Sequence, residues 1–191
     1  MTQQDVDDWT PLRTESLLLR RPRPDDLDPA VQIHTDPSTN RHHPEPWTVT
    51  EESSARRFQE LGEHWERHGF GVWVVEQLEQ PGVIVGFTGL SHRTVHQRSA
   101  LNLYYRYAPD VWGKGYATEA ASTAVRHAAI HLSDLPVLAY TTPDNLGSQR
   151  TALRVGLDRM SELDIEHEHY TDIFFAHNWP AGAKSRESSG S

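Results

Sequence analysis

Residues 101–120 read LNLYYRYAPDVWGKGYATEA, which is the most informative stretch of the chain. Leu101–Tyr107 is rich in aliphatic and aromatic residues, as is typical of a strand, and a proline follows soon after it. Gly113 and Gly115 then precede a segment whose alanines recur at helical spacing. Glycines at a helix start expose backbone N–H groups, and the helix N-terminus adds partial positive charge. The stretch predicts a phosphate or pyrophosphate site; the alternative is a tight turn that needs glycine's conformational freedom.

Two common nucleotide-binding motifs do not fit this stretch. The chain has no Gly-x-x-x-x-Gly-Lys-Ser/Thr run, and no third glycine follows Gly115 at the spacing of a dinucleotide fingerprint. Further along, Val137–Thr142 is an almost wholly apolar strand, which we expect to be buried on both faces. Polar residues follow within Pro143–Ser148, at the strand end where ligands of open α/β sheets bind. The sequence therefore predicts a ligand crevice beside this strand end.

The periodicity elsewhere predicts further strands and helices in the same order. The expected strands are Leu17–Arg21, Gly71–Glu76, Val83–Leu90 and Asp172–Trp179. Four helices are expected. The first is opened by Asp28 and Pro29 and runs to about Thr35, and the second is capped by Thr50 and stops at His68-Gly69. The third follows Gly115, and the fourth is opened by Asp144 or Asn145 and ended by Gly156. Because a meander of strands gives way to alternating helices and strands, we expect a mixed α/β sheet with helices on both faces.

Composition excludes several classes of chemistry and partner. The chain has 191 residues, a formal net charge of −9 and no cysteine. Disulfides, zinc–thiolate sites and acyl-cysteine intermediates are therefore excluded. An acidic chain lacks the basic surface that nucleic acids and anionic membranes attract, and no apolar run reaches the roughly 18 residues that span a bilayer. We expect a cytoplasmic protein, monomer or homodimer, that binds neither nucleic acid nor membrane.

One folded domain is expected between residues 12 and 180. Residues 1–11 are interpreted as an N-terminal extension, since they are acidic and lack the basic and apolar regions of a signal peptide. Residues 181–191, which read AGAKSRESSGS, are small, polar and unpatterned and predict a disordered tail.

The central motif resembles that of the GCN5-related N-acetyltransferases (GNAT), and in particular their RimJ/RimL-like branch. The matching features are Ala108-Pro109, the run WGKGYATEA at 112–120, Asn145-x-x-Ser148, and Val155-Gly156-Leu157. Weaker similarity extends to Leu17–Arg20, Phe70–Val75 and Asp172–Ala176, so the resemblance covers roughly residues 12–180. It implies a single-domain, mostly antiparallel sheet splayed between two central parallel strands, here Leu101–Tyr107 and Val137–Thr142. Acetyl-CoA, as co-substrate, would lie in the gap between them.

The resemblance also implies roles for individual residues. Backbone groups of Tyr105 and Tyr107 would bind the pantetheine arm as an added strand does, and Asn145 would bind a pantetheine amide. The residues expected around the pyrophosphate are Trp112, Gly113, Lys114, Gly115, Tyr116, Ala117 and Thr118. Trp112 departs from the broad superfamily, which has Arg or Gln there, but tryptophan is usual in this branch. Ser148 would lie near the sulfur and bind or protonate the leaving thiolate; its alternative role is a bond to local backbone.

The implied reaction moves an acetyl group from acetyl-CoA to a primary amine of a small molecule or a protein N-terminus. An unperturbed alkyl amine has a pKa of about 10.4, so a base or a water chain must deprotonate it. A backbone N–H of the Leu101–Tyr107 strand would bind the developing oxyanion. Since the chain has no cysteine, we expect direct transfer in a ternary complex.

The general base is not identified by the motif. Many relatives have a carboxylate at the position of Asn102, and an asparagine cannot accept the proton. The other candidates are Glu166, Glu168, Tyr170 and Asp172, each of which also fits a solvated surface position. The alternative function is a non-catalytic acyl-CoA-binding module that has lost its base.

No metal site is expected, because the twelve histidines show no three-ligand set at a recognisable spacing. Trp47, Phe70 and Trp73 are candidates for the wall of the acceptor pocket, with core packing the alternative for Trp73.

Overall fold

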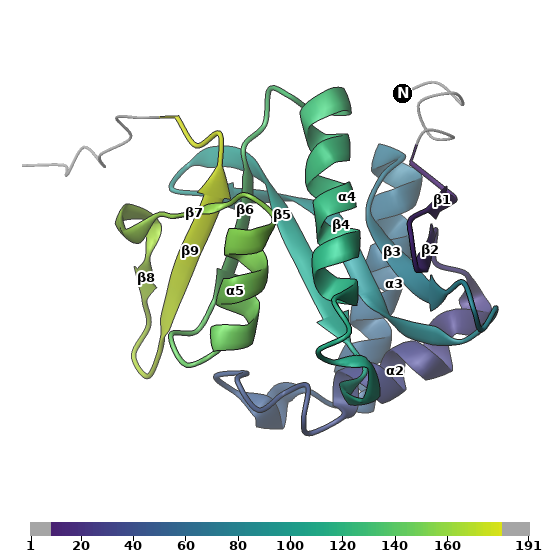
Figure 1. Ribbon diagram of the computed structural model, residues 1–191. Helices are drawn as coiled ribbons and strands as arrows, with labels where there is room; N and C mark the ends of the chain where they lie inside the picture. The colour runs from purple at the N-terminus through teal and green to yellow at the C-terminus, as the bar shows by residue number, and fades with distance from the viewer. Residues whose placement is uncertain (1–8, 181–191) are drawn as a thin grey trace, which may run out of the picture.

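A mixed sheet forms the centre of the protein in the computed structural model, which describes residues 9–180 (Figure 1). The strands are β1 Leu12–Arg13, β2 Leu17–Arg20, β3 Val72–Gln77, β4 Ile84–Val95, β5 Arg98–Tyr107, β6 Val137–Thr141, β7 Asp158–Arg159, β8 Ile165–Glu166 and β9 Thr171–His177. Their order across the sheet is β1-β2-β3-β4-β5-β6-β9-β7, and β8 also pairs with β9. Among these pairs only β5 and β6 run parallel. The predicted mixed, mostly antiparallel sheet is confirmed.

Helices cover both faces of this sheet, as expected. They are α2 Leu27–Thr35, α3 Glu51–His68, α4 Tyr116–His131 and α5 Leu146–Arg154. In Figure 1, α4 and α5 lie in front of the sheet and α3 lies behind it. The buried face of α4 is made of Ala120, Ala121, Ala124 and Ala128. Because alanine has the smallest apolar side chain, this helix packs closely against β4 and β5.

The two central strands separate soon after they meet. β5 and β6 pair only at Leu101 with Val137 and at Asn102 with Leu138. Past these two pairs β5 continues to Tyr107 and β6 to Thr141 with no pairing between them, and Figure 1 shows the two strands diverging. The predicted splay is therefore present, and it leaves one edge of β5 without a neighbouring strand.

β6 is not buried on both faces along its whole length, so that expectation was wrong. Val137, Leu138 and Ala139 are buried, but Tyr140 is 37% exposed. Tyr140 lies beyond the last pair with β5, on a part of the face that lines a cavity instead of packing under a helix. The run of apolar residues therefore predicted this strand correctly, but it did not show where along the strand the packing helix ends.

Helix ends follow capping chemistry with one correction. Thr50 caps α3, since its hydroxyl accepts a hydrogen bond from the Ser53 amide at 3.1 Å. Asn145, and not Asp144, caps α5. The helix predicted to open at Asp28 begins at Leu27 instead, because a short 3₁₀ turn leads into it. Asp26 precedes that helix, and its carboxylate binds the buried guanidinium of Arg20 in a bidentate pair at 2.6 and 2.7 Å.

Trp9, within the predicted N-terminal extension, packs against the core of the folded domain. Trp9 is 1% exposed, its ring packs against Phe70 and Trp73, and its carbonyl accepts a hydrogen bond from the Trp73 indole at 2.7 Å. The boundary at residue 12 stays a prediction. Residues 1–8 and the predicted tail at 181–191 lie outside the described residues. Within 9–180, no helix combines the length and apolar character needed to cross a bilayer.

His34 joins α2 to the sheet as a buried, neutral side chain. Its Nδ1 lies 2.7 Å from the Ala30 carbonyl oxygen and its Nε2 lies 2.9 Å from the Tyr104 hydroxyl. The carbonyl cannot donate, so Nδ1 carries the proton and Nε2 accepts from Tyr104. Burial, followed by the nearby positive charge of Arg106, lowers the pKa of His34 from 6.5 to about 4.

Gly89 tests the close approach of β3 and β4. A Cβ at Gly89 would lie 2.2 Å from the Gly71 carbonyl oxygen and 2.6 Å from Val72 Cα. We expect Gly89→Ala to lower the free energy of unfolding by about 3 kcal/mol, because backbone atoms cannot move aside cheaply. Gly62→Ala is the matched control: nothing lies within 4 Å of its Cβ position in α3, so it should stabilise by about 0.5–1 kcal/mol. Equal effects in urea denaturation would contradict this account.

The depressed pKa of His34 makes stability depend on pH. Between pH 6.5 and about 4 the unfolded chain binds a proton that folded His34 refuses, so stability falls as the pH decreases through this window. The expected slope from this group is at most about 1.4 kcal/mol per pH unit. We expect His34→Gln to flatten the pH dependence measured by urea denaturation, whereas His169→Gln, whose side chain is 83% exposed, should not. An unchanged slope in His34→Gln would refute the assignment.

Candidate functional site

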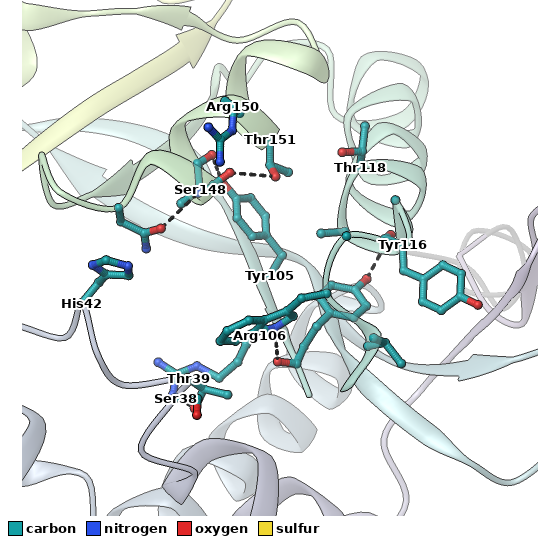
Figure 2. A pocket seen from close by; sticks show the side chains of 18 of the residues that line it. Ser38, Thr39, His42, Tyr105, Arg106, Tyr116, Thr118, Ser148, Arg150 and Thr151 are labelled. Atoms are coloured by element: carbon teal, nitrogen blue, oxygen red, sulfur yellow. Dashed lines mark hydrogen bonds between the residues drawn. The ribbon is translucent and has the colours of Figure 1, made fainter. Parts of the chain in front are cut away.

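A cavity of about 460 Å³ lies where β5, the loop before α4 and the start of α5 come together (Figure 2). It brings together most residues that the sequence motif predicted. Those that line it are Tyr105, Tyr107, Trp112, Gly113, Gly115, Tyr116, Ala117, Thr118, Asn145 and Ser148. Lys114 was predicted with them, but it is exposed and does not line this cavity. The loop before α3 adds Ser38, Thr39, Arg41 and His42 to the lining, which the motif did not predict.

The loop before α4 presents unpaired backbone donors to this cavity. Gly113 and Gly115 have φ angles of +80° and +87°, which favour glycine over any residue with a side chain. Within residues 9–180, no backbone hydrogen bond is made by the amides of Gly113, Gly115, Tyr116, Ala117 and Thr118. α4 also has no side-chain cap at its N-terminus. The positive end of the helix is therefore free to bind an anion.

Charge around this cavity has one sign. Arg41, Arg106, Arg150 and Arg154 line it, and no aspartate or glutamate does. In a chain with a net charge of −9, this local excess of guanidinium groups is unexpected. Guanidinium groups and backbone amides are the donors that phosphates prefer in proteins, so the cavity suits a ligand with several phosphate charges.

The free edge of β5 continues the cavity into the sheet. The Leu101 amide donates to the Pro136 carbonyl at 2.8 Å, across the side of β5 that faces β6. Every second residue of a strand directs its backbone groups to the same side, so those of Tyr105 and Tyr107 face the gap. The Trp112 indole already donates to the Tyr107 carbonyl at 2.9 Å. The backbone N–H and C=O of Tyr105 and the backbone N–H of Tyr107 therefore remain available for hydrogen bonds at the gap.

A hydroxyl pair lies where the gap opens. Tyr105 Oη is 2.9 Å from Ser148 Oγ, and it also donates to the Ser148 carbonyl at 3.0 Å. Burial raises the pKa of Tyr105 to about 12, so the phenol stays protonated at neutral pH. Ser148 Oγ thus contacts a side chain from β5 and not the local backbone, which was the alternative for this serine. The Ser148 amide donates to Asn145 Oδ1 at 3.1 Å, so one contact begins α5 and positions Ser148.

A second cavity, of about 840 Å³, lies on the side of the sheet that α2 and α3 cover. It shares six lining residues with the first: Thr39, His42, Tyr105, Arg106, Asn145 and Ser148. The two cavities therefore meet at the hydroxyl pair. Of the candidate bases, Tyr170 and Asp172 line the second cavity, whereas Glu166 and Glu168 do not. Asn102 also lines it, and its buried Oδ1 has no hydrogen-bond partner within the described residues.

The walls of the second cavity are not the predicted aromatic residues. Phe70 and Trp73 are buried in the core, and Trp47 is 74% exposed; none of the three lines either cavity. Four tyrosines line the second cavity instead: Tyr104, Tyr105, Tyr140 and Tyr170. Two of them lie beneath a guanidinium, since Arg57 is 4.7 Å from the Tyr104 centroid and Arg93 is 4.0 Å from that of Tyr140. Strand alternation would have found Tyr104, since it shares a face of β5 with Asn102 and Arg106.

A histidine–carboxylate pair was missed altogether. His42 Nδ1 lies 2.7 Å from Asp144 Oδ2, although the two residues are 102 positions apart. The Thr142 hydroxyl also donates to Asp144, and together these hydrogen bonds lower the pKa of the Asp144 carboxyl. No sequence pattern joins the loop before α3 to the loop after β6, so only the folded chain identifies this pair.

The histidine pair on α4 has a packing role. The rings of His127 and His131 lie 5.3 and 5.8 Å from the Trp9 ring. Across the part of the chain that the structure describes, no group of three or more His, Asp or Glu residues is arranged to hold a metal ion.

Comparison with known proteins gives a consistent set of matches. The family model described as "Acetyltransferase (GNAT) domain" matches residues 16–158. YkkB of Bacillus subtilis is 24% identical over 121 residues, which is 63% of this chain and 63% of that protein. A crystal structure of an acetyltransferase from Agrobacterium tumefaciens is 24% identical, with a TM-score of 0.71 over 88% of this chain and 94% of that one. RimL, a ribosomal L7/L12 α-N-protein acetyltransferase solved with coenzyme A, is 17% identical, with a TM-score of 0.64 over 87% and 96%.

Proposed function

The chain belongs to the GNAT acetyltransferase family, and on this premise we propose that it transfers an acetyl group from acetyl-CoA directly to a primary amine. The observation that carries the proposal is the meeting of two cavities at the Tyr105–Ser148 hydroxyl pair, where β5 and β6 part. The first cavity suits the donor and the second the acceptor, so the acetyl carbon and the amine would meet between them. The acceptor is the amine of a small molecule or of a protein N-terminus.

The first cavity fits the polar parts of coenzyme A. The unpaired amides of Gly113 and of residues 115–118 would hold the pyrophosphate, with the four lining arginines near its charge. The free backbone groups of Tyr105 would pair with the pantetheine amides, and the Asn145 amide group would donate to a pantetheine carbonyl. RimL was solved with coenzyme A, and its similarity in fold supports the same ligand here.

The transfer itself is a nucleophilic addition followed by elimination. The lone pair of the neutral amine forms a bond to the thioester carbonyl carbon, and the carbonyl π electrons move to oxygen. A backbone N–H at the free edge of β5 would bind that oxyanion, which is worth about 3 kcal/mol in comparable sites. The C–S bond then breaks, the sulfur leaves with its electron pair, and the nitrogen loses one proton. The products are an N-acetyl amine and coenzyme A.

The hydroxyl pair would stabilise the leaving sulfur. Tyr105, when it donates to Ser148 Oγ, frees the Ser148 proton to donate to the thiolate. An alkyl thiol has a pKa of about 8.5, so complete proton transfer from a phenol of pKa about 12 would be uphill by roughly 5 kcal/mol. Ser148, supported by the Tyr105 hydroxyl, would therefore hydrogen-bond the thiolate while the C–S bond breaks, and water would supply the final proton.

Direct transfer is favoured over an acyl-enzyme intermediate. The chain has no cysteine, and within residues 9–180 no histidine is hydrogen-bonded to Ser148. The partner of its Oγ is a phenol, which cannot act as a base toward the serine. Ser148 is therefore assigned to the leaving group and not to a covalent intermediate.

A non-catalytic acyl-CoA-binding module is the second candidate, because Asn102 occupies a position where many relatives have a carboxylate. Both candidates bind acetyl-CoA, so turnover separates them. Acetyl-CoA mixed with a panel of amines and N-terminal peptides should release free thiol, measured by a colorimetric reagent. Binding without thiol release from any acceptor would favour the binding module.

Gly115→Glu tests the anion site. A carboxylate at the first cavity would exclude the pyrophosphate and repel its charge, so we expect CoA affinity measured by calorimetry to fall at least roughly 100-fold. Gly82→Glu is the matched control, since Gly82 has a similar φ of +85°, lies in the β3–β4 turn and lines neither cavity. An unchanged CoA affinity in Gly115→Glu would show that this loop does not bind the pyrophosphate.

The hydroxyl pair is tested by a double-mutant cycle. Ser148→Ala and Tyr105→Phe should each lower kcat roughly 10- to 100-fold, the value of a hydrogen bond to a charged group, while CoA affinity stays nearly normal. The double variant should be little worse than either single one, because Tyr105 acts on the sulfur only through the Ser148 hydroxyl. An unaltered rate in Ser148→Ala would remove Ser148 from the mechanism. Losses that add in the double variant would show that the two hydroxyls act independently.

A further inference from the structure

His42 lies at the junction of the two cavities. Among the described residues it is the one histidine that lines both, and no aspartate or glutamate lines both. In Figure 2, His42, Tyr105 and Ser148 gather at one end of the cavity, with Thr118 and Tyr116 at the other. His42 is therefore on the side where the acetyl group and the acceptor would meet.

The hydrogen bonds of His42 define which nitrogen carries the proton. Nδ1 lies 2.7 Å from the Asp144 carboxylate, which can only accept, so Nδ1 is the donor. Nε2 accepts a hydrogen bond from Nε of Arg41 at 3.0 Å. The Nε2 lone pair thus already accepts a hydrogen bond from an N–H group. The Arg41 side chain that supplies this N–H is exposed and lies over the Trp112 ring.

We propose that His42 is the general base that takes the proton from the acceptor amine, and that Asp144 is its positioning residue. This inference rests on the proposed acetyltransferase function. The acceptor N–H takes the place that Arg41 occupies at Nε2, and Asp144, by accepting from Nδ1–H, directs the Nε2 lone pair at the amine. A base oriented by a carboxylate is the usual arrangement for imidazole in acyl transfer.

Other titratable groups of the second cavity are less suited to this role. His34 and His43 line only the second cavity, and burial lowers the pKa of both. Asp172 is paired with His167 at 3.2 Å, and Asp172 lines only the second cavity. The charged groups that hydrogen-bond the His42 ring are Asp144 and Arg41.

The proton balance closes with these groups. The ammonium that forms when the amine adds to the thioester carbon gives its N–H electron pair back to nitrogen, and the proton goes to Nε2 of His42. The resulting imidazolium faces the Asp144 carboxylate, which stabilises it. His42 then releases the proton to water after the C–S bond breaks, while the thiolate takes a proton from water through Ser148.

The test compares His42→Ala, Asp144→Asn and two control variants. We expect kcat of His42→Ala to fall roughly 100-fold or more, with KM for acetyl-CoA and calorimetric CoA affinity unchanged. Added imidazole should restore part of the rate, which a structural role would not allow. Asp144→Asn keeps the side-chain shape without the charge and should lower kcat roughly 10-fold, also without changing KM for acetyl-CoA. His169→Ala and Asp134→Asn remove exposed groups that line neither cavity and should leave kcat unchanged.

The outcomes distinguish this inference from the function on which it rests. Wild-type protein that binds CoA and releases thiol in the presence of an amine supports the acetyltransferase function. A full rate in His42→Ala would then overturn only the assignment of His42 as the general base. Loss of rate in His42→Ala with no rescue by imidazole and a matching loss of CoA affinity would make His42 a structural residue. Wild-type protein with no turnover on any amine would overturn both.

Discussion

The separation of β5 and β6 after two paired residues is the constraint on which the rest of the structure depends. Sheet strands normally saturate their backbone groups with a neighbour, and an unpaired edge in the middle of a sheet is costly unless something else pairs with it. Here one side of β5 is fully paired with β4 along its length, while the other side is open beyond Asn102. The opening connects the two faces of the sheet and creates the only described place where both cavities meet.

The two sides of that opening have different electrostatic character. The side toward α4 and α5 has unpaired amides and arginines without a carboxylate, so a strongly anionic ligand is stabilised there despite the acidic chain. The side toward α2 and α3 mixes arginines, carboxylates, histidines and tyrosines. The proposed reaction would therefore place a phosphate-rich donor on one face of the opening and a chemically different acceptor on the other.

Local folding and the site use the same contacts. Asn145 Oδ1 begins α5 by accepting from the Ser148 amide, and that bond directs the Ser148 hydroxyl toward Tyr105. Because the oxygen of Asn145 is used by the helix, only its amide nitrogen is left for a ligand. The Trp112 indole similarly donates to the Tyr107 carbonyl, so the loop before α4 removes one acceptor from the free strand edge. Capping and packing contacts thus select which backbone groups remain available.

The sequence by itself determined the fold class, the order of the main strands and helices and the Gly113–Gly115 loop, because each depends on periodicity or glycine's φ freedom within a few residues, and the family resemblance drew attention to Asn145 and Ser148. It misjudged the start of α2, the exposure of Tyr140 and the walls of the second cavity, since burial depends on what packs above a residue. Only the tertiary structure joined His42 to Asp144 across 102 positions and Tyr105 to Ser148 across 43. Side chains far apart in a chain approach one another only through the packing of elements, and no local pattern encodes that distance.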